Sequence, residues 1–219
     1  MKKGNAILVG AVLAASTVAS SVAMAELSGN IGFTSNYLWR GVDQSGGDSA
    51  ISGGLDYAHD SGLYAGTWVS SIGDDNGQYE QDWYAGYGFD AGPIGMDVGY
   101  IMYTYPVGNA TLDFDEAYVS ASYEMVTVGA ALTMDKEVTT QYEDDMYIYA
   151  SADFEVKEGL GLGVTVGDYD FDDPASTDYT HYQVSLSKDD FTFAYDATDL
   201  DGADGDARFT VSYSKSFDL

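Results

Sequence analysis

The sequence predicts an all-β protein: a transmembrane antiparallel β-barrel of about twelve strands, joined as an up-and-down meander. Three observations lead to this prediction. Apolar and polar residues alternate with a period of two over most of the chain, as expected for strands with one apolar face. The connections between these segments alternate between long and short, and the number of segments is even. Outer-membrane barrels combine short periplasmic turns, long outer loops and an even strand number.

The composition excludes several classes of function. The 219 residues include 36 acidic and 8 basic side chains, a formal net charge of -28, and no cysteine. A disulfide framework, a cysteine metal site and a basic nucleic-acid-binding surface are therefore excluded. The 26 glycines, 19 tyrosines and 3 prolines are spread through the chain, which suits strands better than helices.

Residues 1–25 have the features of a cleaved signal peptide. Lys2 and Lys3 precede an apolar run, and Ala23-Met24-Ala25 supplies a small-residue cleavage site. The run is shorter than the roughly 20 residues that a spanning helix needs. We therefore expect Sec-type export and a single barrel domain over residues 26–219.

Turn residues divide the rest of the chain into predicted strands. The first places apolar, aromatic or small residues at every odd position, and Leu38 is the exception. It is about twice as long as a strand in a typical soluble protein. The third strand shows no clean alternation, so its facing is not assigned. The twelve strands are predicted at residues 27–40, 49–59, 62–72, 79–90, 94–105, 114–124, 126–135, 145–156, 160–168, 179–187, 191–197 and 207–219.

The apolar face has two interpretations. In a membrane barrel it points outward to lipid, and the closed sheet satisfies every backbone hydrogen bond. In a soluble lipocalin-like barrel or a sandwich it points inward to a core. Strands of roughly ten residues match the tilted spans of a membrane barrel and favour the first interpretation. Lipid, lipopolysaccharide and the barrel-assembly machinery are then expected partners, and the oligomeric state stays open.

Aromatic residues on the apolar phase gather toward the predicted strand ends. Rings with a polar edge are favourable at the depth of lipid headgroups, so these residues predict two membrane girdles. Packing preference alone would explain their abundance but not their positions. The girdle residues are Tyr37, Trp39, Tyr79, Trp83, Phe89, Phe154, Phe191 and Phe217.

Charged residues on the opposite phase predict an acidic lumen. Such a lumen would prefer cations, because fixed negative charge repels anions. Alternatively, the acids pair with arginines and tyrosine hydroxyls in a filled, closed interior, as in small barrels. The predicted lumen and selectivity residues are Arg40, Asp56, Glu80, Asp82, Asp97, Glu116, Asp153, Glu155 and Arg208.

The six long connections also carry acid, twenty acidic residues against one base, Lys136. This charge would either concentrate cations at the mouth or simply keep the surface solvated. One loop places Asp199, Asp201, Asp204 and Asp206 close in sequence and is a weak candidate for bound Ca²⁺ or Mg²⁺. The spacing does not match a twelve-residue calcium loop, because Ala203 occupies the third ligand position.

Catalysis has little support in the sequence. The two histidines, His59 and His181, accompany no G-x-S-x-G motif. A membrane phospholipase would need serine and histidine together on the lipid face, whereas His181 falls on the lumenal phase. We therefore predict no catalytic residues.

Two segments show a family resemblance. Ser35-Asn36-Tyr37-Leu38-Trp39-Arg40-Gly41-Val42-Asp43-Gln44-Ser45, followed by residues 56–68, resembles the opening of the TorF porin family. The similarity extends to the Ser214–Phe217 ending. The resemblance implies an outer-membrane barrel of Gram-negative bacteria. In that setting Arg40 is a potential counter-charge for Glu80, Asp82 or the loop acids.

Together these patterns predict a porin-like channel for passive diffusion of small hydrophilic solutes, with a preference for cations and no required cofactor. The alternative is a closed structural or surface-interaction barrel whose acidic loops bind divalent cations or a partner.

Overall fold

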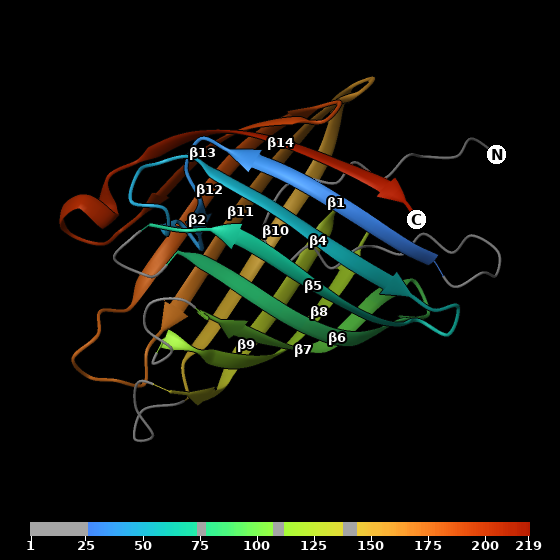
Figure 1. Cartoon of the computed structure of the whole chain (residues 1–219). Helices are drawn as coiled ribbons and strands as arrows, with labels where there is room; N and C mark the ends of the chain where they lie inside the picture. The colour runs from blue at the N-terminus through green and yellow to red at the C-terminus, as the bar shows by residue number, and fades with distance from the viewer. Residues whose placement is uncertain (1–25, 74–77, 107–111, 138–143) are drawn as a thin grey trace.

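The wall of the molecule is a single sheet of twelve antiparallel strands that closes on itself (Figure 1). The computed structural model describes residues 26–73, 78–106, 112–137 and 144–219; the predicted signal peptide lies outside them. The wall strands are β1 (Glu26–Thr34), β4 (Ala50–Ala58), β5 (Leu63–Ser71), β6 (Tyr79–Ala91), β7 (Ile94–Thr104), β8 (Phe114–Tyr123), β9 (Val126–Lys136), β10 (Met146–Lys157), β11 (Leu160–Asp170), β12 (Tyr179–Lys188), β13 (Phe191–Thr198) and β14 (Arg208–Asp218).

Closure is made by the first and last strands. Ile31 of β1 pairs with Lys215 of β14 on one side and with Gly53 of β4 on the other. Every other wall strand pairs with its neighbours in sequence order, so the predicted meander is confirmed. Because no wall strand is left at an edge, the backbone groups of the sheet are paired within the sheet.

The alternation of short and long connections is also present in the structure. Tight turns join β4 to β5, β6 to β7, β8 to β9, β10 to β11 and β12 to β13. We call this end the turn side and the opposite end the loop side. The C-terminus lies on the turn side, and the short 3-10 helix η2 (Gly202–Gly205) lies on the loop side (Figure 1).

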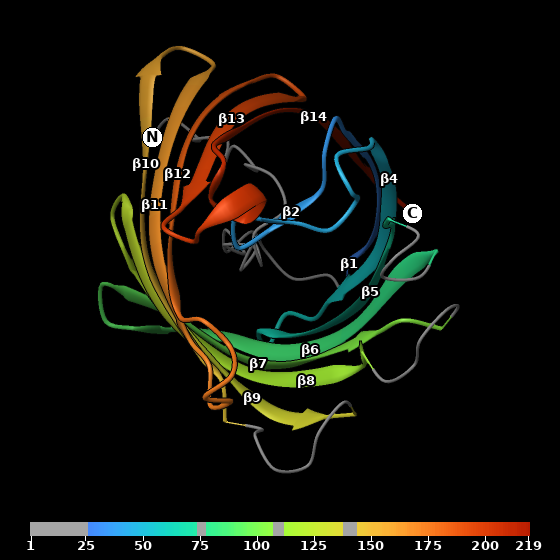
Figure 2. The ribbon, with the colours of Figure 1, turned by 90° about the vertical axis from the view of Figure 1, so that its left-hand side faces the viewer.

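The predicted first strand is wrong in its second half. β1 ends at Thr34, whose register partner Ala50 already belongs to β4. Between them the chain turns into the barrel and forms a small hairpin of β2 (Leu38–Trp39) and β3 (Val42–Asp43), visible inside the ring of strands in Figure 2. We call residues 35–49 the inner hairpin.

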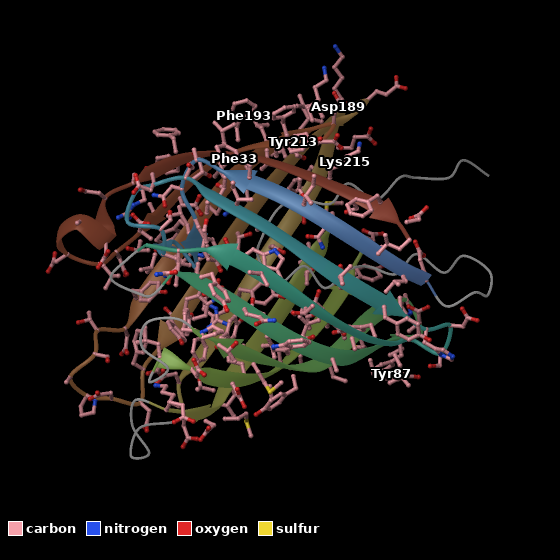
Figure 3. The ribbon with its side chains drawn as sticks, viewed as in Figure 1. Phe33, Tyr87, Asp189, Phe193, Tyr213 and Lys215 are labelled. Carbon is pink, nitrogen blue, oxygen red and sulfur yellow. The ribbon has the colours of Figure 1, made fainter. Side chains whose placement is uncertain are left out.

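The outer wall is apolar and exposed. Phe33, Tyr87, Phe193 and Tyr213 project away from the barrel (Figure 3). Exposed apolar area on this scale marks a surface that meets something other than water. Five of the predicted girdle residues are 39–49% exposed, namely Trp83, Phe89, Phe154, Phe191 and Phe217.

The other predicted girdle residues differ. Tyr79 is half-buried at the loop-side start of β6. Tyr37 and Trp39 belong to the inner hairpin, and Tyr37 is only 6% exposed, so assigning these two to the outer wall was wrong.

Within the described residues, no helix is long and apolar enough to cross a membrane.

Tyrosines and glycines face each other across the inner wall. The ring of Tyr84 in β6 lies over Gly66 of β5, and the ring of Tyr147 in β10 lies over Gly167 of β11. A Cβ atom at either glycine would collide with the ring. These wall glycines therefore have a packing reason, since each of them makes room for a lumenal tyrosine.

Candidate functional site

The inner hairpin is fixed inside the barrel by a buried ion pair. The guanidinium of Arg40 donates two hydrogen bonds to Glu116 of β8, at 2.8 and 2.7 Å. The two side chains are 4% and 0% exposed. A bidentate arginine–carboxylate pair fixes both distance and orientation. The pair therefore holds the tip of the hairpin against the β8 wall.

Aromatic rings surround the same guanidinium. Its central carbon lies 4.2 Å from the ring centre of Trp39, 4.2 Å from that of Tyr147 and 5.0 Å from that of Tyr169. Cations are attracted to aromatic faces at these distances. Burial lowers the pKa of Arg40 and the carboxylate of Glu116 raises it, and the net shift is upward. Arg40 is therefore charged at all physiological pH values.

A second buried carboxylate contacts the base of the hairpin. Glu80 of β6 accepts hydrogen bonds from the hydroxyls of Tyr37, at 2.7 Å, and Tyr105, at 2.8 Å. Glu80 is 2% exposed. Near it, Oδ1 of buried Asp82 has no hydrogen-bond partner among the described residues. We call Tyr37, Arg40, Glu80, Tyr105 and Glu116 the loop-side cluster.

The tip of the hairpin also reaches the far wall. Gly41 has a φ of +84° and packs so closely on His181 and Thr198 that a Cβ atom would come within 2.7 and 2.8 Å of them. His181 Nε2 lies 3.2 Å from the Asp196 carboxylate. The hairpin therefore crosses the lumen from β1 and β4 to β12 and β13 (Figure 2).

The turn-side half of the lumen is built differently. Tyr64 donates to Asp97, at 2.8 Å, and its hydroxyl lies 2.6 Å from that of Tyr118. Tyr84 donates to Asp56. Asp97 is 8% exposed, and the other four are half-buried. We call these five residues the turn-side network; no hairpin residue contributes to its hydrogen bonds.

The sequence placed most of the lumen acids on the correct phase but did not predict their partners. Arg40 pairs with Glu116, whereas Glu80 and Asp82 were its suggested partners. Arg208 approaches Asp43 of the inner hairpin at 3.9 Å. Asp153 and Glu155 lie at the turn-side end of β10, where both are exposed. Whether any of these residues sets ion selectivity stays a prediction.

The four aspartates of the 199–206 loop do not converge. Among the described residues, no group of three or more histidine, cysteine, aspartate or glutamate side chains is arranged to hold a metal ion. Asp199 instead accepts a hydrogen bond from the backbone N–H of Thr180, at 2.7 Å.

The loop-side mouth contains a cavity of about 520 Å³ that is lined in part by the inner hairpin. Its aromatic lining includes Trp39, Phe114 and Phe171, and Asp113, Lys136 and Asp145 contribute charge. No residue pattern in the sequence predicted this cavity. The sequence feature that could have indicated an aromatic mouth is a tyrosine or phenylalanine repeated at the loop-side strand ends. These residues are Tyr103, Tyr105, Phe114, Tyr169, Phe171 and Tyr179.

Comparison with known proteins supports the fold. The sequence model of one bacterial family, described as a bacterial protein of unknown function (Gcw_chp), matches residues 18–218. No curated protein matches the chain. The resemblance to the TorF porins stays a hypothesis.

Three solved structures share the architecture at low sequence identity. A KdgM porin superposes with a TM-score of 0.57 at 10% identity, covering 87% of this chain and 99% of the porin. The KdgM porin in complex with disordered oligogalacturonate gives 0.57 at 8% identity, covering 88% and 99%. A chain reported in work on in-meso crystallization of membrane proteins gives 0.57 at 10% identity, covering 89% and 84%. The barrel therefore shares the fold of these solved porin structures.

Proposed function

The chain belongs to the Gcw_chp family of bacterial proteins, and we propose that it forms an outer-membrane channel for small neutral or cationic hydrophilic solutes. One observation carries the proposal. A porin-type barrel presents apolar side chains outward, while its lumen is lined by hydroxyls and carboxylates. A polar lumen inside an apolar wall is the arrangement through which water and solutes cross a bilayer.

The charge of the lumen supports a preference for cations. Carboxylates line both halves of the lumen. Two basic residues on the loop side, Arg40 and Lys136, each form an ion pair with a carboxylate and so add no net positive charge. Asp82 keeps one oxygen without a protein partner. One structural neighbour was solved with oligogalacturonate, which is a polyanion. An oligogalacturonate chain would be repelled by the carboxylates of this lumen. We therefore propose that this channel prefers cationic solutes.

The inner hairpin sets the constriction of the proposed channel. It crosses the lumen and buries Arg40, Glu116 and Glu80 at the level where it meets the wall. The same burial favours a second candidate function, a closed barrel with a structural or surface-interaction role. The two functions differ in whether the path beside the hairpin conducts.

Planar-bilayer conductance tests the proposal and separates the two functions. Thr34 and Ala50 are register partners, so the hairpin can be excised and replaced by an Asn-Gly turn without changing the wall. We expect cation-selective steps from the native barrel and larger steps, still cation-selective, from the excised barrel. Both proteins must first show heat-dependent migration on gels, as folded barrels do.

Silence from the native barrel together with conduction by the excised one would support the closed-barrel function. Anion selectivity in the excised barrel would contradict the proposed role of the wall carboxylates.

A further inference from the structure

The cavity at the loop-side mouth has the chemistry of a site for an organic cation. Its volume of about 520 Å³ falls within the range of roughly 300–1,000 Å³ that is usual for small-molecule sites. Trp39, Phe114 and Phe171 contribute half-buried rings to its lining. Each ring comes from a different segment, namely the inner hairpin, β8 and the connection after β11. A ligand in the cavity would therefore meet aromatic surface on several sides.

The charge of the lining favours a cation. Lys136 forms an ion pair with Asp145 and so contributes no net positive charge. Asp113 accepts a hydrogen bond from the backbone N–H of Tyr105, at 2.7 Å, and no base among the described residues forms an ion pair with it. The connection between β11 and β12, residues 171–178, adds Asp172, Asp173 and Asp178 at the same end. The mouth is therefore aromatic and net negative.

Two rings of the cavity lining already contact a cation within the protein. Trp39 and Tyr169 both line the cavity, and both contact the flat guanidinium of Arg40. The charge of Arg40 is neutralised at 2.7 Å by Glu116, so it does not make the neighbouring cavity positive. Flat delocalised cations stack on aromatic faces better than compact ammonium groups do.

We propose that this mouth cavity binds organic cations with a flat, delocalised charge, such as amidinium or guanidinium groups on an apolar body. This inference rests on the proposed function, because it names the class of solute that meets the channel at its loop-side entrance. The bound cation would stack on Trp39 and Phe171 and lie near Asp113, with the inner hairpin as the floor of the site.

Isothermal titration of the purified barrel in detergent tests the proposal with three probes of nearly equal shape. Benzamidinium is a cation, benzamide is neutral and benzoate is an anion. We expect benzamidinium to bind about tenfold more tightly than benzamide, the ratio expected for one partly desolvated cation–π contact, and benzoate not to bind. Raising the salt concentration should weaken benzamidinium binding, because the attraction is partly electrostatic.

Two variants locate the site. Phe171→Ala should remove most benzamidinium binding, and Asp113→Asn should weaken it while keeping an oxygen for the Tyr105 N–H. Phe193→Ala is the matched control, because Phe193 is 57% exposed on the outer wall and its loss should change only partitioning into the micelle. An equal loss in Phe193→Ala and Phe171→Ala would overturn the proposal, and so would equal binding of benzamide and benzamidinium.

Binding and conduction are measured separately, so the two proposals fail separately. A barrel that conducts but binds no benzamidinium refutes only the mouth site. A barrel that binds benzamidinium with the expected variant effects but never conducts refutes only the channel.

Discussion

The loop-side and turn-side halves of the lumen both contain carboxylates, but they stabilise them in different ways. On the loop side, Glu116 and Glu80 are 0% and 2% exposed, and their donors come from the inner hairpin and the wall. On the turn side, the donors come from wall strands, namely Tyr64 to Asp97 and Tyr84 together with Asn30 to Asp56, and most of that network is half-buried. The loop side therefore depends on exact partners, whereas water can replace a lost partner on the turn side.

Removing Arg40 should produce the largest difference between the two halves. Arg40→Ala removes the ion-pair partner of buried Glu116 and leaves it only the Tyr103 hydroxyl, at 3.4 Å, which costs about 3–5 kcal/mol in the free energy of unfolding. Urea titration of the folded barrel in lipid vesicles measures this loss. Lys215→Gln is the matched control, because the Lys215–Asp190 pair is solvent-exposed and should contribute little.

The double variant Arg40→Met with Glu116→Leu sharpens the result. It removes both charges and should recover most of the lost stability. A double variant as unstable as Arg40→Ala would show that packing of the hairpin, and not the unpaired charge, carries the effect.

Adding a methyl group at the hairpin tip should have the next largest effect. Gly41→Ala combines a φ of +84° with collisions against His181 and Thr198, for a cost of about 2–4 kcal/mol. Gly159→Ala shares a positive φ, +73°, but has open space around it, so it should cost less. Equal losses in the two variants, measured by the same titration, would mean that the tip is not in contact with β12 and β13.

Removing one tyrosine hydroxyl in each half compares them directly. Tyr37→Phe takes a donor from buried Glu80 and should cost about 1–3 kcal/mol. Tyr64→Phe takes a donor from Asp97, which is 8% exposed against 2% for Glu80, and should cost less. The comparison would break if Tyr64→Phe proved the more destabilising of the two.

Neutralising an exposed turn-side acid should have the smallest effect. Asp153→Asn removes one fixed negative charge from the turn-side end of β10 without burying an unpaired group. We expect unchanged stability and a small decrease in cation selectivity, which the reversal potential across a KCl gradient reports. The decrease should disappear in concentrated salt, because solvated charges are screened there. An unchanged reversal potential at low salt would remove Asp153 from the conduction path.

The sequence predicted the wall much better than the lumen, for a physical reason. A period of two indicates that a strand has two different faces, and in the wall those faces are the exposed outer surface and the lumen. The alternation therefore placed Trp83 and Phe89 outside and Glu80 and Asp97 inside.

The same signal failed in the inner hairpin. Residues 35–37 continue the alternation of β1 although the wall strand has already ended at Thr34. Leu38 breaks the phase only four residues later, so the alternation by itself overextends the strand. The pairing of Arg40 with Glu116 joins positions 76 residues apart and depends on barrel closure, which no local pattern encodes.

Closure by the first and last strands also constrains the order of assembly. The inner hairpin follows β1 directly, whereas β14, which seals β1 into the wall, is made last. The sealing contact joins residues from opposite ends of the chain, so it is the most expensive in chain entropy and is expected to form late. The inner hairpin can therefore pack against β8 and β12 before β1 and β14 pair. The barrel then closes around a hairpin that is already in place.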